Sequence, residues 1–179
     1  MSPATTEQVL QRLDAEFTTR AAPYAHRESA LLALLHAVQE AYGWVFPEAE
    51  AAVGSFLGVG SNRVHEAVTF YTLFRQKPYG RHHVMACRTL TCDVTGGADL
   101  VRLLRDRLKV GPREATPDGM FSWETVECLG CCDLAPALQV NREPYRGPMT
   151  VPALAALLDE LKASGAGQPA VAAAGGSRG

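Results

Sequence analysis

Apolar positions recur every three or four residues through residues 1–75, which predicts a series of amphipathic helices. Thr5 followed by Gln8 is typical of a capping box, so the first helix is expected over residues 5–20. A second helix is expected over residues 27–42, because a stripe of apolar side chains ends there at Gly43. The stripe consists of Leu31, Leu34, Leu35, Val38 and Tyr42.

Two further helices are expected in the same region. Pro47 suits the first turn of a third helix, which should end at Gly58. Ser61 is expected to cap a fourth helix over residues 61–74. Its inward-facing positions should be Val64, Ala67, Val68 and Tyr71. Stripes of this kind favour packing in a helical bundle over any chemical role.

The pattern changes after "RQKPYGR", where Pro78 and Gly80 indicate a boundary between two units. The order of elements beyond it is β-α-β-β-α, with a further short strand expected near Tyr145. Strands are expected at residues 82–87, 120–128 and 136–140, and helices at residues 96–110 and 151–164. The first of these helices should turn Leu100, Leu103, Leu104 and Leu108 inward, and Pro152 suits the first turn of the second.

These elements predict an α+β protein with two structured domains. Residues 1–75 should form an N-terminal helical domain, and residues 76–163 a mixed domain of strands and helices. Residues 164–179 are mostly Gly, Ala, Pro and Ser, so they should bury little surface and form a flexible tail.

Composition excludes several classes of protein. The 179 residues are 47% hydrophobic with a formal net charge of −2, which does not favour nucleic acid as the main partner. No apolar run approaches the roughly 20 residues that span a bilayer. The first 20 residues resemble neither a signal peptide nor a transit peptide, and they carry Glu7, Asp14 and Glu16. We therefore expect a cytoplasmic protein, in which clustered cysteines bind metal or act in redox chemistry.

The five cysteines lie in two short stretches, "MACRTLTCDVTGG" and "VECLGCCDLAPALQ". Four residues separate Cys87 from Cys92, and three separate Cys128 from Cys132, with Cys131 as a fifth thiol. Two loops that each offer two thiolates suit a [2Fe–2S] cluster. Glycines at 96, 97 and 130 should let backbone amides approach the sulfur atoms.

Three other interpretations of the thiols remain open on spacing alone. Structural zinc could use Cys87, Cys92, Cys128 and Cys131. A thioredoxin-type dithiol could use Cys128 and Cys131, although such motifs usually follow an early strand. The third interpretation is that the cysteines are buried and inert. Five thiols in two short stretches beside Gly, Asp and Pro are not typical of a packed core.

Residues 56–71 also resemble a helix–turn–helix, so an iron–sulfur-sensing DNA-binding regulator is a hypothesis of a different class. The second helix would offer Arg63 and His65 and little other positive charge, which weakens this hypothesis. No histidine is expected to be a ligand. His82 and His83 should alternate across a strand, so that at least one of them faces solvent.

The whole pattern resembles the thioredoxin-like [2Fe–2S] subunit of NADH:quinone oxidoreductase, the NuoE-type component of complex I. The family spacing is Cys-x₄-Cys, about 35 residues, then Cys-x₃-Cys, and here the cysteines at 87, 92, 128 and 132 meet it. Flanking stretches also match: "RESALLALLHAVQEAYGWV", "VTFYTLF" and "PDGMFSWETVECLGCCDLAPALQVN". The resemblance covers roughly residues 23–162 and selects Cys132, rather than Cys131, as the fourth ligand.

The resemblance implies an N-terminal helical bundle followed by a thioredoxin-like [2Fe–2S] ferredoxin domain. It implies one cluster, held by Cys87, Cys92, Cys128 and Cys132, that exchanges single electrons with the FMN of a partner subunit. That partner, and not this chain, would bind NADH, and a neighbouring iron–sulfur subunit would complete the surroundings. The chain would thus have no catalytic residue of its own and would be part of an enzyme of the respiratory chain.

The resemblance also places the chain peripherally on the cytoplasmic face of the inner membrane, with no direct membrane insertion and no nucleic acid bound. The same module occurs in NAD-linked hydrogenases and formate dehydrogenases, and these alternatives stay open. The bundle is expected to dock on the flavin subunit through surplus apolar residues, notably Phe70, Tyr71 and Phe74.

Charged neighbours should influence the potential of a cluster at this place. Asp93, Asp133 and Glu127 adjoin the cysteines, while Arg88 partly opposes them. Because reduction adds negative charge to an already anionic group, these carboxylates should lower its reduction potential. Such a low potential fits a side store for one flavin electron better than a link in the main electron path.

Overall fold

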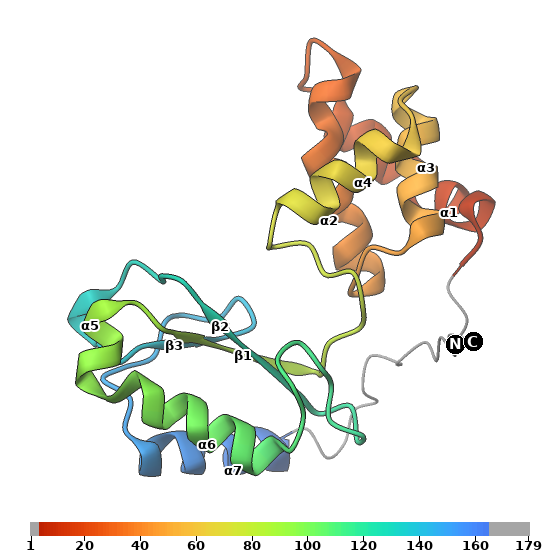
Figure 1. Ribbon diagram of the computed structural model, residues 1–179. Helices are drawn as coiled ribbons and strands as arrows, with labels where there is room; N and C mark the ends of the chain where they lie inside the picture. The colour runs from red at the N-terminus through yellow and green to blue at the C-terminus, as the bar shows by residue number, and fades with distance from the viewer. Residues whose placement is uncertain (1–3, 165–179) are drawn as a thin grey trace. The chain divides into compact units, whose positions relative to one another are not determined.

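The computed structural model describes residues 4–164, and the predicted tail beyond Ser164 lies outside the described residues. The chain forms two compact units that divide between Pro78 and Tyr79 (Figure 1). Each unit packs around a hydrophobic core of its own.

The first unit is helical. It contains α1 (Thr6–Ala21), a short 3₁₀ turn η1 (Arg27–Ala30), α2 (Leu31–Tyr42), α3 (Pro47–Leu57) and α4 (Ser61–Phe70). The expected capping box is present: the Gln8 amide donates to Thr5 Oγ1 at 3.3 Å, and Gln8 Oε1 accepts from the Thr5 amide at 2.8 Å. The second and third helices end as expected at Gly43 and Gly58, whose backbones are left-handed.

The fourth helix differs from the expectation at both ends. Ser61 is its first residue rather than its cap, and Gly60 holds the cap position without a side-chain hydrogen bond. The helix ends at Phe70, because Tyr71 has extended backbone angles. Tyr71 is consequently 38% exposed rather than inward, and the chain turns Phe74 into the core, where its exposed fraction is 5%.

The second unit is built on a three-stranded sheet in the order β2-β1-β3. The strands are β1 (His82–Cys87), β2 (Phe121–Val126) and β3 (Leu138–Val140). Strand β1 pairs with β2 in parallel and with β3 antiparallel. Near Tyr145 the chain forms only an isolated bridge between Leu138 and Arg146, so the further strand expected there is not formed.

Two helices cover one face of this sheet (Figure 1). They are α6 (Ala98–Leu108), which makes the crossover between the parallel strands, and α7 (Val151–Ser164). The core beneath them comprises Val84, Ala86, Leu100, Leu104, Phe121, Trp123, Leu154 and Leu158, among others. Because side chains alternate along a strand, His83 and Glu124 belong to the other face of the sheet.

The expectation that His82 or His83 faces solvent is wrong. His83 is only 1% exposed, and both ring nitrogens of His82 are buried without a hydrogen-bond partner. Within residues 4–164, no helix is long and apolar enough to cross a membrane.

Candidate metal centre

All five cysteines line one small cavity in the second unit, together with Thr89, Thr91, Leu129 and Gly130. The sheet explains this convergence: Cys87 ends β1 opposite Val126, which ends β2, so both cysteine-bearing segments leave the sheet at the same edge. The segments lie 36 residues apart in sequence, from Cys92 to Cys128, and the parallel pairing of β1 with β2 brings them together.

The first cysteine segment is more regular than the predicted loop. Cys92 ends a short helix, α5 (Leu90–Cys92), and a wide helical turn, η2 (Asp93–Gly97), leads directly into α6. Gly96 has a φ of 108°, which favours glycine. A Cβ atom on Gly97 would lie 2.7 Å from the Cys92 carbonyl oxygen, so this glycine allows the backbone to pass close to a candidate ligand.

The second cysteine segment is a loop that leads into a short 3₁₀ turn, η3 (Cys132–Leu134). The Gly130 amide donates a hydrogen bond to Cys128 Sγ at 3.2 Å, as expected for an amide near a ligand sulfur atom. Arg88, from the first segment, forms an ion pair with Glu127, from the second. This pair links the two segments and offsets the charge of one neighbouring carboxylate.

The surroundings shift the pKa values of three thiols. Burial acts to raise the pKa of Cys87, but hydrogen bonds from Thr89, Cys92 and Leu129 outweigh it, and the pKa lies below its usual value. Burial raises the pKa of Cys92, and the neighbouring Cys87 raises it further. Burial and then the charge of Asp133 raise the pKa of Cys131. The lowered pKa of Cys87 favours its thiolate form, which is the form that binds metal.

The chemistry of the donors fits a cluster with sulfur ligands. The residues that line the cavity include thiols and threonine hydroxyls, but no histidine, aspartate or glutamate. Among residues 4–164, no three His, Cys, Asp or Glu side chains are grouped so as to hold a metal ion. Cys131 lines the cavity as Cys132 does, so the geometry alone does not select between them.

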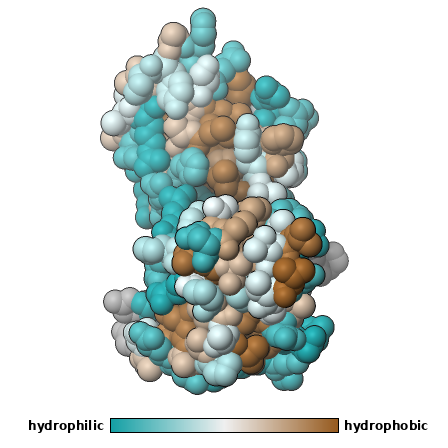
Figure 2. All heavy atoms as spheres, turned by 90° about the vertical axis from the view of Figure 1, so that its left-hand side faces the viewer, coloured by the Kyte–Doolittle hydropathy of each residue, from teal (hydrophilic) through white to brown (hydrophobic). Residues whose placement is uncertain are grey.

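The other residues predicted near the ligands surround the cavity. Asp93 and Asp133 are exposed beside their cysteines, as is Glu127. Leu90 and Val94, which the cysteine spacing does not indicate, stand 74% and 73% exposed on either side of Cys92. Their apolar character and position two residues from a cysteine were the available signal. Figure 2 shows apolar areas among polar ones on the face of the second unit where α5 lies.

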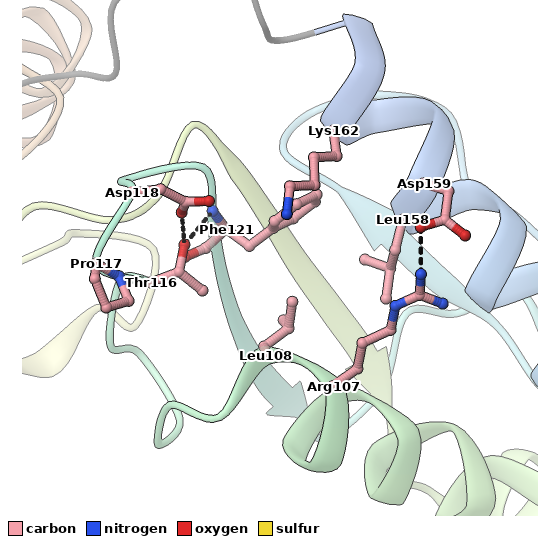
Figure 3. Close-up of a pocket in the computed structure, with 9 residues that line it drawn as sticks. All are labelled: Arg107, Leu108, Thr116, Pro117, Asp118, Phe121, Leu158, Asp159 and Lys162. Atoms are coloured by element: carbon pink, nitrogen blue, oxygen red, sulfur yellow. Dashed lines mark hydrogen bonds and ion pairs between the residues drawn. The ribbon is translucent and has the colours of Figure 1, made fainter.

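A larger cavity in the second unit lies near the start of β2, away from the cysteines (Figure 3). Its charged groups are largely paired: Arg107 with Asp159, and Asp118 with the hydroxyl of Thr116. Lys162 at its rim adds a cation near Asp118. No thiol lines this cavity, so it offers no alternative site for the predicted cluster.

Comparison with known proteins gives one consistent result. Residues 17–162 match the family described as thioredoxin-like [2Fe–2S] ferredoxin. Subunit 2 of the NADH-quinone oxidoreductase of Thermus thermophilus is 40% identical over 141 residues, which cover 79% of this chain and 78% of that protein. The second E-type subunit of the Rhizobium meliloti enzyme is 38% identical over 149 residues, which cover 83% of this chain and 88% of that one.

Among solved structures, an NAD⁺-reducing [NiFe]-hydrogenase in its air-oxidized state has a similar fold. The TM-score is 0.64 at 22% sequence identity, over 73% of this chain. The chain spans only 23% of the length of that hydrogenase chain, so the likeness concerns one part of a larger protein.

Proposed function

The chain belongs to the thioredoxin-like [2Fe–2S] ferredoxin family, and from this we propose that it is a one-electron carrier within an NADH-oxidising complex. It is a relative of the E-type subunits of NADH-quinone oxidoreductase. The observation that carries the proposal is the convergence of two cysteine pairs on one cavity at the edge of the sheet. The family spacing gives Cys87, Cys92, Cys128 and Cys132 as the ligands.

The residues of the chain supply ligands, charge balance and shape for this task. A [2Fe–2S] cluster, when bound, stores a single electron. The thiolate form of Cys87 is favoured by its hydrogen bonds, and the Gly130 amide stabilises negative charge on Cys128. Asp93 and Asp133 oppose the addition of an electron, while Arg88 compensates Glu127. These carboxylates support the proposed low potential.

The proposed partner is a flavoprotein subunit that binds FMN and NADH, with an iron–sulfur subunit beside it. The names of the relatives support a place in an NADH-quinone oxidoreductase. A location at the cytoplasmic face of the inner membrane is part of the proposal. The second candidate is the same role in an NAD-linked hydrogenase or formate dehydrogenase. Of these two, the hydrogenase is the one that has a similar fold among solved structures. In either case the hydride chemistry belongs to the partner.

The DNA-binding regulator remains the more remote alternative. The cations of the helix that would enter the major groove are already engaged, because Arg63 pairs with Glu66 at 3.0 Å and His65 with Glu50 at 2.9 Å. Little positive charge is left there to contact phosphates.

Metal analysis of the full-length protein, purified without oxygen, tests the proposed function. We expect a red-brown protein with about two irons and two acid-labile sulfides per chain, the content of one [2Fe–2S] cluster. A colourless protein with one zinc ion and no sulfide would contradict the cluster and support the zinc interpretation. A metal-free protein with a reversible Cys128–Cys131 disulfide would support the dithiol interpretation instead.

A further inference from the structure

A polar network is buried in the sheet of the second unit, on the strands that lead to the cysteines. His83 Nε2 lies 2.9 Å from Glu124 Oε1, and His83 Nδ1 lies 2.8 Å from Ser122 Oγ. Arg113 Nε donates to the other oxygen of Glu124 at 2.5 Å. The Tyr79 ring lies against the imidazole with 4.3 Å between centroids. The proposed function uses none of these side chains.

The network can accommodate two protonation states of His83. Ser122 Oγ already accepts a hydrogen bond from the Gly80 amide at 3.0 Å. When His83 is neutral, Nε2–H donates to Glu124 and the Ser122 hydroxyl donates to Nδ1. When His83 is charged, both ring nitrogens donate, and Ser122 Oγ accepts a second hydrogen bond. Within these contacts, the two states differ in the orientation of the Ser122 hydroxyl.

His83 is the imidazole in a network whose other two ionisable groups, Glu124 and Arg113, pair with each other. Burial acts to raise the pKa of Glu124, but hydrogen bonds from His83 and Arg113 outweigh it, so this pKa is lowered and the carboxylate stays ionised. Arg113 pairs with that carboxylate at 2.5 Å, so the titratable side chain left in the network is the imidazole of His83, which is 1% exposed. Other titratable or charged groups on the adjoining segments are Tyr79, Arg81, Arg142 and Glu143.

The strands connect this network to the candidate metal centre. His83 precedes Cys87 by four residues along β1, and Glu124 precedes Cys128 by four. At about 3.3 Å per residue, roughly 13 Å separates the His83 and Cys87 backbones. One unit of charge at this distance inside a protein shifts a pKa by on the order of one unit.

We propose that His83, held by Glu124 and Ser122, is a proton-binding site that takes up a proton when the cluster receives an electron. The inference rests on the proposed function, because it requires the cluster. The balance is one electron from a one-electron donor to the cluster and one proton from solvent to His83 Nδ1. No bond between heavy atoms forms or breaks. The proton compensates the added negative charge and makes reduction easier at low pH.

The test is the midpoint potential of the full-length, cluster-containing protein measured against pH, after iron and sulfide have been assayed. In the unmodified protein the potential should fall as pH rises between the His83 pKa values of the oxidised and reduced states, and level off outside that window. His83→Gln should give a potential that does not change with pH in the window. His82→Gln, on the neighbouring residue of the same strand, is the matched control and should keep the dependence.

Two further variants should move the window in opposite directions. Glu124→Gln removes the anion that stabilises charged His83, so the window should move to lower pH. Arg113→Gln removes the competing cation, so the window should move to higher pH. Arg113 has a side chain that is 48% exposed, so the second variant should fold even where the buried substitutions do not.

The outcomes separate this inference from the proposed function. Absence of iron and sulfide would contradict the proposed function before any titration is made. A protein with an intact cluster and a potential independent of pH would overturn the inference alone. An unchanged pH dependence in His83→Gln, or its loss in His82→Gln, would also overturn it.

Discussion

At the scale of single residues, the two adjacent thiols of the second cysteine segment have different surroundings. Cys131 is partly buried and packs with Cys87 and Cys92, whereas Cys132 is exposed at the start of a 3₁₀ turn. Two neighbouring residues of one short loop cannot easily direct both sulfur atoms to one iron. The family spacing assigns Cys132 to the cluster, and Cys131 would then fill space beside it.

Paired alanine variants test this assignment. Cys131→Ala should keep the full iron content and a nearly unchanged absorption spectrum. Cys132→Ala should lose the cluster, or keep a fragile one with Cys131 as the substitute ligand, and the double variant should be worse than Cys132→Ala. Loss of iron from Cys131→Ala, with iron retained in Cys132→Ala, would contradict this assignment. It would support the interpretations in which Cys128 and Cys131 act as a Cys-x₂-Cys pair.

The sequence predicts which segments carry the candidate ligands better than it predicts the side chains around them. The spacing of the cysteines indicated two paired stretches, and the structure brings both to one cavity. The network around His83 could not be predicted in this way. In "FSWETV" the polar Ser122 and Glu124 alternate with apolar residues, a pattern typical of a face in water. Long-range contacts with Tyr79 and Arg113 bury that face instead.

At the scale of elements, regular periodicity was a good guide, but it did not predict where α4 ends. The predicted strand at 82–87 and the predicted helix at 151–164 coincide with β1 and α7. The apolar period in "VTFYTLF" continues through Phe74, although α4 stops at Phe70. The Phe74 ring instead packs 5.1 Å from the ring of His36, a contact with another helix that local sequence does not reveal. The short α5 was missed because three residues carry no period.

The turn before β2 depends on one carboxylate, visible in Figure 3. Asp118 accepts hydrogen bonds from the Thr116 hydroxyl and from the Met120 amide, which lower its pKa below the usual value. A depressed pKa means that the ionised form stabilises the fold at neutral pH. This stabilisation is lost as pH falls through the lowered pKa.

Asp118→Ala should therefore lower the free energy of unfolding by about 1 kcal/mol at neutral pH. The difference from the unmodified protein should vanish in strong acid, where Asp118 is protonated in both the folded and unfolded states. Denaturant titrations across pH measure it. Asp106→Ala, at an exposed aspartate in the last turn of α6, is the control. A difference that stayed constant with pH would show that the ionised form of Asp118 is not what matters.

At the scale of the whole molecule, the residues predicted to form the docking surface of the helical unit must be revised. Phe74 was expected on that surface, but it is a core residue. Phe70 is 77% exposed and lines a groove with Leu31, Leu32, Arg63, Glu66, Ala67, Thr69 and Tyr71. Figure 2 shows a brown apolar band on the helical unit, on the side where α2 and α4 lie in Figure 1.

Phe70→Asp should weaken binding of the proposed flavoprotein partner about tenfold or more, which corresponds to about 1.4 kcal/mol. The cluster spectrum should not change, because the substitution lies in the other unit. Co-purification of the complex through a tag on this chain measures the effect. Tyr24→Asp places the same charge at another exposed aromatic residue outside the groove and should leave binding intact. Equal losses in both variants would exclude the groove as the docking surface.

The cysteine segments follow β1 and β2 at the same edge of the sheet, and this has a consequence for the stability of the chain. A cluster bound by Cys87 and Cys132 would tie together segments about 45 positions apart and act as a cross-link in the topology of the chain. In the chain-entropy treatment of cross-links, closing a loop of this size lowers the conformational entropy of the unfolded state. This stabilises the folded state by about 4 kcal/mol. Iron supply would then govern how long the protein survives proteolysis as well as whether it carries electrons.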